Sequence, residues 1–125
     1  MSNHEASPID RALIARALEE DIGFGDLTTL ATVPAEQTIV ATIITRQSGV
    51  VAGLDLAAAV FQSVDAGLRV EQYVSDGTKV NPNDRLARIE GNARSILTAE
   101  RTALNFLGRL SGIATLTAAC ALAAF

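Results

Sequence analysis

The stretch AERTALNFLGRLSGIAT, residues 99–115, predicts an amphipathic helix with an arginine on its less apolar side. At about 100° per residue, one broad apolar arc collects Ile96, Ala103, Phe106, Leu107, Leu110 and Ile113. The opposite arc carries Arg101, Asn105, Gly108 and Gly112, with Leu97 and Leu104 at its edges. A helix face turned to solvent is usually rich in charged residues. This arc is small and lightly polar, which favours contact with something outside the domain.

Arg101 also has three ordinary explanations. Its guanidinium could pair with Glu90 or Glu100, it could extend along apolar surface to water, or it could form a surface salt bridge of little energetic value. A binding role is favoured by its neighbours on the arc, because Asn105 and the two glycines leave room for a ligand or a second chain. The residues alone leave these alternatives open.

Outward from this helix, the periodicity predicts helices interleaved with strands. Helices are expected from residue 9 to about residue 20, over 54–64 and from 93 onward, and strands over 38–46, 68–75 and 85–91, with 48–54 continuing or pairing with the first strand. In the first helix, Ile9, Leu13, Ile14, Ala17 and Leu18 are predicted to face the core. This order favours an α+β fold with a mainly antiparallel sheet of about four strands and flanking helices.

The last stretch, residues 113–125, reads IATLTAACALAAF. It is apolar, rich in alanine and without a closing cap, so we expect a helix that docks within the domain or on a second copy, or leads into a further domain, and we favour the last. The domain itself is then expected to span residues 1–112.

Composition excludes several classes of protein. The chain is 49% hydrophobic and 19% charged, which suits a folded core, and its net charge of −4 argues against nucleic acid as a partner. No apolar run is long enough to span a membrane, and the N-terminal residues lack a signal-peptide core, so a cytoplasmic location is expected. A single cysteine, Cys120, and a single histidine, His4, exclude an internal disulfide and a cysteine-based metal cluster.

Residues 76–91, DGTKVNPNDRLARIEG, match a hairpin pattern found in lipoyl and biotinyl carrier domains. Those carriers place a modifiable lysine at a hairpin tip, between Asp and Ala or between two Met. The only lysine here, Lys79, stands between Thr78 and Val80. A carrier fold is therefore compatible with the sequence, but the carrier's modification signal is missing.

Three stretches, ALEEDIGFGDLTT (17–29), SGVVAG (48–53) and ILTAERTALNFLGRLSGIAT (96–115), together resemble one family. They are similar to the N-terminal domain of quinolinate phosphoribosyltransferase, or nicotinate-nucleotide pyrophosphorylase (carboxylating), of NAD biosynthesis. The resemblance implies an α/β hammerhead-like sandwich. It also implies a following α/β barrel, on the order of 150 residues, that this sequence lacks.

The resemblance implies a pentosyltransferase that transfers phosphoribosyl from phosphoribosyl pyrophosphate to quinolinate, with Mg²⁺, to give nicotinate mononucleotide, pyrophosphate and carbon dioxide. Most of the family's site lies in the barrel. The residue that the N-terminal domain contributes is the arginine of the ERT.LN motif, which matches Arg101. It would bind a quinolinate carboxylate in the neighbouring subunit of a homodimer or larger homo-oligomer. For this chain alone we expect no bound metal, no catalytic residue and no activity.

Other interpretations remain. The chain could belong to a nicotinate phosphoribosyltransferase-like or molybdenum-uptake-linked branch of the family. It could instead be a non-enzymatic carrier-like domain, or a dimerisation module that self-associates through residues 113–125. Where the family often has a charged residue before GVVAG, this chain has Gln47 and Ser48, which we expect to be an unremarkable surface position.

Overall fold

The computed structural model describes residues 11–17, 19 and 36–122. Residues 11–17 form an N-terminal helix. It is followed by β1 (Thr38–Thr45), β2 (Gly49–Val50), α2 (Leu54–Val64), β3 (Arg69–Gln72), β4 (Lys79–Val80), β5 (Arg85–Asn92), α3 (Ala93–Ser111) and β6 (Leu116–Leu122). Most of the ALEEDIGFGDLTT stretch (17–29) lies outside the described residues.

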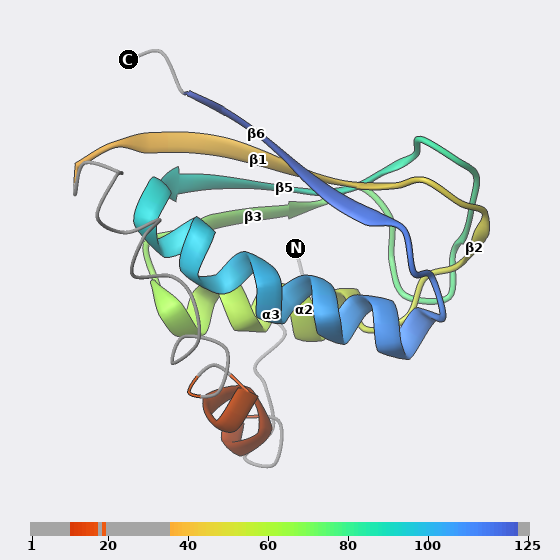
Figure 1. Cartoon of the computed structure of the whole chain (residues 1–125), viewed down its shortest axis with the longest axis horizontal. Helices are drawn as coiled ribbons and strands as arrows, with labels where there is room; N and C mark the ends of the chain where they lie inside the picture. Colours follow the sequence, from red (N-terminus) through yellow and green to blue (C-terminus); the bar gives the residue numbers. More distant parts are fainter. Residues whose placement is uncertain (1–10, 18, 20–35, 123–125) are drawn as a thin grey trace.

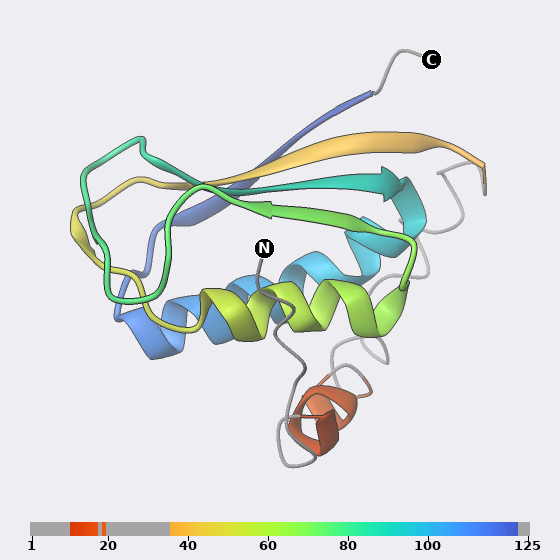
Figure 2. The ribbon, with the colours of Figure 1, turned by 180° about the vertical axis from the view of Figure 1, so that it is seen from behind.

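The main sheet has four strands in the order β3-β5-β1-β6, and every neighbouring pair is antiparallel. The short strands β2 and β4 pair separately at one end of the molecule. Helices α2 and α3 lie together beneath one face of the sheet, as two opposite views show (Figures 1 and 2). The N-terminal helix lies on the side of these helices away from the sheet. The predicted α+β sandwich with a four-stranded antiparallel sheet is therefore confirmed.

Strand β1 is built from β-branched residues that alternate between two environments. Ile39, Ala41, Ile43 and Thr45 are buried, while the residues between them are only half-buried. Successive side chains of a strand point to opposite faces, so the first set meets the helices and the second forms the outer face of the sheet. The β1 register pairs Ile43 with Ala87 on one side and with Ala118 on the other.

Helix α3 begins and ends at residues suited to its caps. The Asn92 side chain accepts the backbone N–H of Ser95 at 3.1 Å, which satisfies one of the free amides of the first turn. At the other end, Gly112 has a φ of 72°, and its N–H bonds to the carbonyl of Gly108 at 2.9 Å. A left-handed residue at a helix end is typical of glycine.

The predicted apolar arc of α3 is mostly confirmed. Ile96, Ala103, Leu107 and Ile113 are buried in the core, and Phe106 packs against it. The prediction for Leu110 is wrong, because 54% of that side chain is exposed. It lies over Gly53 instead, at the start of α2.

The prediction of a helix over 113–125 is wrong for 116–122, which form strand β6 along the free edge of β1. Alanine favours a helix in isolation, but tertiary context overrides propensity where a long partner strand is available. The backbone N–H of Arg46 and the carbonyl of Thr115 form a 2.8 Å hydrogen bond at the start of this ladder.

Among its described residues, the N-terminal helix buries one side chain, that of Ile14, in the core. Ile14 is buried, as expected, but Leu13 is 46% exposed, so the prediction for that residue is wrong. A single helical face can bury only part of a helix that packs from outside on two others. Ile9 and the side chain of Leu18 lie outside the described residues.

Candidate functional site

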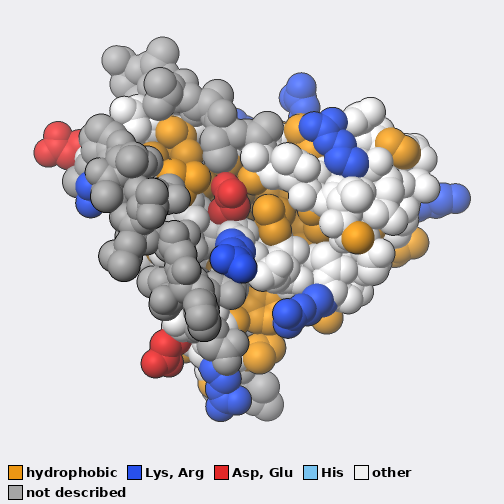
Figure 3. Space-filling model, viewed as in Figure 1, with side chains coloured by type: hydrophobic (Ala, Val, Ile, Leu, Met, Phe, Trp, Pro, Cys, Tyr) orange, Lys and Arg blue, Asp and Glu red, His pale blue; other side chains and the backbone are white. Residues whose placement is uncertain are grey.

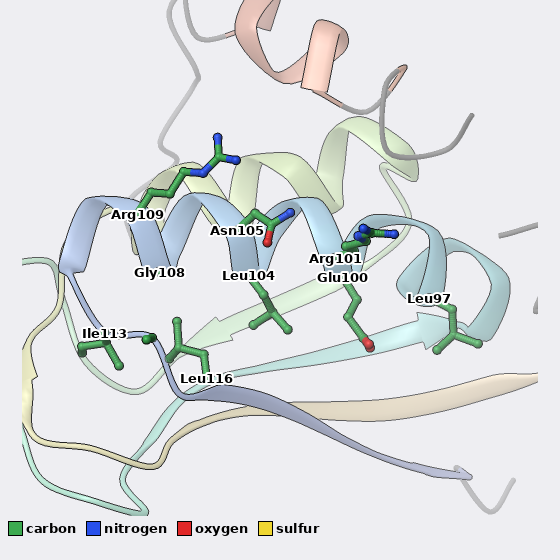
Figure 4. Close-up of a pocket in the computed structure, with 10 residues that line it drawn as sticks. Leu97, Glu100, Arg101, Leu104, Asn105, Gly108, Arg109, Ile113 and Leu116 are labelled. Atoms are coloured by element: carbon green, nitrogen blue, oxygen red, sulfur yellow. The ribbon is translucent and has the colours of Figure 1, made fainter. Parts of the chain in front are cut away.

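An open groove of about 690 Å³ lies between α3 and the segment that follows it, residues 113–116, which leads into β6 and is called the returning chain below (Figure 4). Its lining combines apolar side chains with a few polar ones: Leu97, Glu100, Arg101, Leu104, Asn105, Gly108, Arg109, Ile113, Ala114 and Leu116. In the space-filling view of this face, apolar and basic surfaces lie close together over the middle of the molecule (Figure 3). The groove is thus a mixed surface with the predicted Arg101 arc as one wall.

Arg101 is exposed at this groove and is the first residue of the helix face predicted from the sequence. Within the described part of the chain, its guanidinium has no hydrogen bond or ion pair. Glu90, one of the partners considered from the sequence, lies 3.3 Å from the guanidinium of Arg88 instead. Arg101 therefore keeps its five donors available to a ligand.

Asn105 is the next residue on this face, one turn after Arg101, and Arg109 follows one turn later. All three side chains project from the outward side of α3, since residues four apart share a helix face. In Figure 4 the Arg101 and Asn105 side chains leave the helix on the solvent side, while Leu104 points toward the sheet. Glu100 extends on the same side as Leu104, so this wall of the groove carries one carboxylate among its apolar side chains.

Gly108 and Gly112, the two glycines of this face, have structural roles that the sequence did not indicate. A Cβ on Gly108 would stand 3.2 Å from the carbonyl oxygen of Ile113, so this glycine makes room for the chain's own return after α3. Gly112 provides the left-handed cap, and a Cβ there would meet nothing within 4 Å. Each glycine therefore has a reason within the chain itself, and whether the two also clear space for an outside partner stays a prediction.

Gln47 has a role that the sequence analysis missed. Its side-chain oxygen accepts the backbone N–H of Ala114 at 3.1 Å, and the N–H and hydroxyl of Thr115 at 3.3 and 3.0 Å. These bonds hold the segment that forms one wall of the groove. The partners lie 67 and 68 residues away along the chain, so no local pattern could have indicated them.

Neither Lys79 nor the described acidic residues form a second functional site with other side chains of the described chain. Lys79 is exposed in β4, opposite Val50 of β2. Among the residues that the structure describes, no three side chains of His, Cys, Asp or Glu come together as they would to hold a metal ion.

Solved structures with the same fold define the class of protein. NadC from Streptococcus pyogenes superposes with a TM-score of 0.80 at 32% identity, over 88% of this chain and 40% of that one. The nicotinate-nucleotide pyrophosphorylase from Francisella tularensis gives a TM-score of 0.74 at 37% identity, over 84% of this chain and 37% of that one. The chain thus has the fold of one part of these longer proteins.

The sequence comparison makes the assignment specific. The model of the family "Quinolinate phosphoribosyl transferase, N-terminal domain" matches residues 26–111. The chain therefore belongs to the quinolinate phosphoribosyltransferase family, through that family's N-terminal domain. The resemblance stated from the three motifs is confirmed.

Curated relatives include the chloroplastic nicotinate-nucleotide pyrophosphorylase (carboxylating) of Oryza sativa subsp. japonica. It is 48% identical over 115 residues, which are 91% of this chain and 31% of the relative. The corresponding protein of Mycobacterium leprae is 44% identical over 112 residues, 87% of this chain and 39% of the relative. The chain thus spans about a third of the length of the curated relatives it matches.

Within the described residues, no helix combines the length and apolar character needed to cross a membrane.

Proposed function

We propose that this chain serves as the N-terminal domain of a quinolinate phosphoribosyltransferase and supplies Arg101 as a quinolinate ligand. The activity itself, phosphoribosyl transfer to quinolinate with loss of one carboxylate as carbon dioxide, requires the further residues that the longer relatives have. In the proposed assembly, Arg101 reaches a neighbouring subunit of a homodimer or larger homo-oligomer. A cytoplasmic location remains part of the proposal, although two sets of plant relatives are named for chloroplasts and mitochondria.

The observation that carries the proposal is the exposure of Arg101 and its lack of a bonding partner among the described residues. Its guanidinium is exposed on an open groove and has no partner among the described residues. A planar guanidinium binds a carboxylate through two parallel hydrogen bonds, which gives both charge neutralisation and orientation. Quinolinate presents two adjacent carboxylates, so a cation of this shape suits it better than a lysine would.

The groove's openness supports a site completed by another polypeptide. A pocket for a small molecule usually encloses most of its ligand. Here one wall is α3 and the other is the returning chain, and the rest opens to solvent. In this proposal, the other groups that hold the pyrophosphate, and any Mg²⁺, come from the rest of the assembly.

A chimera tests the proposal directly. This chain would replace the matching 39% of the Mycobacterium leprae relative, and phosphoribosyl transfer would be followed with quinolinate and with nicotinate as acceptors. We expect activity with quinolinate. Arg101→Gln in the chimera should raise the quinolinate KM by about tenfold or more, or abolish activity, since a charge-assisted bidentate contact is lost.

Arg69→Gln is the matched control, because Arg69 is an exposed arginine on β3, away from the groove. Its chimera should keep the parent's KM. An active chimera whose quinolinate KM is unchanged by Arg101→Gln would overturn the assigned role. A chimera that accepts nicotinate and rejects quinolinate would instead favour the nicotinate phosphoribosyltransferase-like branch.

A further inference from the structure

A second, smaller hollow of about 150 Å³ lies between the N-terminal helix and α3. It is lined by Leu13, Arg16, Ala17, Thr102, Asn105, Phe106 and Arg109. Asn105 and Arg109 also line the larger groove, so the two spaces are neighbours along one face of α3.

Two arginines from different helices contribute to this hollow. Arg16 comes from the N-terminal helix and Arg109 from the last turn of α3. Figure 4 shows the Arg109 guanidinium turned away from the returning chain, toward the side on which the N-terminal helix lies. Both side chains are exposed, and neither has an ion pair or hydrogen bond with a residue that the structure describes.

Two cations around one small space repel each other unless an anion lies between them. The hollow also has Asn105, whose amide can donate two hydrogen bonds. Leu13 and Phe106 give it apolar walls, and low-polarity walls strengthen an electrostatic contact. The lining therefore combines two positive charges, an amide donor and apolar side chains.

A simpler explanation accounts for only part of this arrangement. A basic residue in the last turn of a helix is stabilised by the helix dipole, and Arg109 occupies that position in α3. The dipole does not explain why Arg16 lines the same hollow from another helix. It also does not explain the half-exposed Leu13, which leaves this side of the helix pair open.

The size of the hollow limits what it can take. A water molecule occupies about 30 Å³ in the liquid, and pockets for drug-sized ligands start at roughly 300 Å³. A volume near 150 Å³ therefore fits a single phosphate or carboxylate group rather than a whole nucleotide. A larger molecule could extend past Asn105 into the adjoining groove.

We propose that Arg16 and Arg109, with Asn105, form a binding site for one oxyanion group, a phosphate or a carboxylate, of a small molecule. The two guanidinium groups would approach the oxyanion from opposite helices, and the Asn105 amide would donate to it from the α3 side. This site does not depend on the role proposed for Arg101.

The test uses the chain as it stands. Inorganic phosphate and, separately, acetate would be titrated at constant ionic strength, and the arginine Nε–H signals would be followed by NMR. We expect saturable shifts for Arg16 and Arg109. Phosphate binding tighter than acetate binding would identify a phosphate group as the ligand, and the reverse order would identify a carboxylate.

Four variants test whether Arg16 and Arg109 bind the anion. Arg16→Gln and Arg109→Gln should each weaken the affinity by about tenfold or more, since each removes a charge-assisted hydrogen bond. Arg109→Lys should fall between Arg109→Gln and the parent, because it keeps the charge and loses the planar fork. Arg69→Gln, which removes one exposed arginine on β3, should leave the affinity unchanged.

Circular dichroism would first establish that all variants keep the parent's fold. The absence of saturable binding of either anion would overturn the proposal. It would also be overturned if Arg69→Gln weakened binding as much as the two hollow variants did, since that would show a general charge effect. Binding that is lost in Arg101→Gln and retained in Arg16→Gln and Arg109→Gln would place the anion in the larger groove instead.

Discussion

The side-chain oxygen of Gln47 accepts both the backbone N–H of Thr115, at 3.3 Å, and its hydroxyl, at 3.0 Å. The same oxygen accepts the N–H of Ala114. One amide oxygen thus joins the corner after β1 to the chain that leaves α3. Because that chain forms a wall of the Arg101 groove, the shape of the groove depends on a residue that does not line it.

We expect Gln47→Ala to lower the free energy of unfolding by about 0.5–1.5 kcal/mol, because two backbone amides and a hydroxyl, all exposed, exchange their acceptor for water. Urea denaturation measures the loss, and hydrogen exchange should accelerate at Ala114 and Thr115. Gln47→Glu should retain most of the stability, since a carboxylate also accepts these bonds. Gln62→Ala, at an exposed position of α2, is the control. Equal losses for both alanine variants would show that the Gln47 bonds contribute nothing.

Asp76 caps α2 from outside the helix. Its carboxylate accepts the N–H of Leu54 at 2.7 Å and that of Asp55 at 3.4 Å, while the residue at the N-cap position, Gly53, has no side chain to do so. Asp76→Ala should therefore cost about 1 kcal/mol of stability, and Asp76→Asn clearly less, because its amide oxygen can still accept. Thermal unfolding would measure both. The exposed Glu71→Ala provides a comparison in which no cap is lost, and a similar shift there would contradict the capping role.

Gly53 and Gly77 form a natural pair for separating backbone strain from packing. Their φ angles are 90° and 92°, but a Cβ on Gly53 would stand 2.6 Å from Leu110 Cδ1, whereas one on Gly77 would meet nothing within 4 Å. Gly53→Ala should cost about 1 kcal/mol more than Gly77→Ala, since Leu110 must move.

In a Leu110→Ala background most of the extra cost at Gly53 should disappear, because only Leu110 Cβ, 3.1 Å from the added methyl group, remains in contact. A double-mutant cycle would measure that coupling. An extra cost as large in the Leu110→Ala background as in the parent would contradict the packing explanation.

We expect the chain by itself to form no nicotinate mononucleotide from quinolinate and phosphoribosyl pyrophosphate. A site for this reaction must hold a dicarboxylate and a pyrophosphate together, which calls for a larger set of basic and acidic groups than the groove presents. Chromatographic detection of the product would test this, with the Mycobacterium leprae relative as a positive control. Product formation above the background of an enzyme-free blank would overturn the expectation.

The sequence predicted the elements whose signals are local. The β-branched run at 38–45 predicted β1, and the 3.6-residue period from Ile96 to Leu107 predicted α3 with Arg101 on its outer face. These patterns succeed because burial on one face imposes a period that can be counted. The family followed from motifs that the comparisons confirm.

The errors concern residues whose environment depends on distant segments. The alanine-rich 116–122 forms a strand because β1 offers a free edge, and Leu110 is exposed because its partner is Gly53 rather than the core. The importance of Gln47 depends on backbone amides after α3. Neither propensity nor periodicity contains this information, since both describe a residue only through its near neighbours in the chain.

The place of β1 in the sheet has a consequence for how the domain forms. Both hydrogen-bonding partners of this early strand, β5 and β6, come much later along the chain. Contacts between distant segments carry a large loop-closure entropy and slow folding. During synthesis, the first strand must therefore remain without a sheet partner until most of the chain has emerged from the ribosome, and its apolar residues are exposed to other chains for that interval.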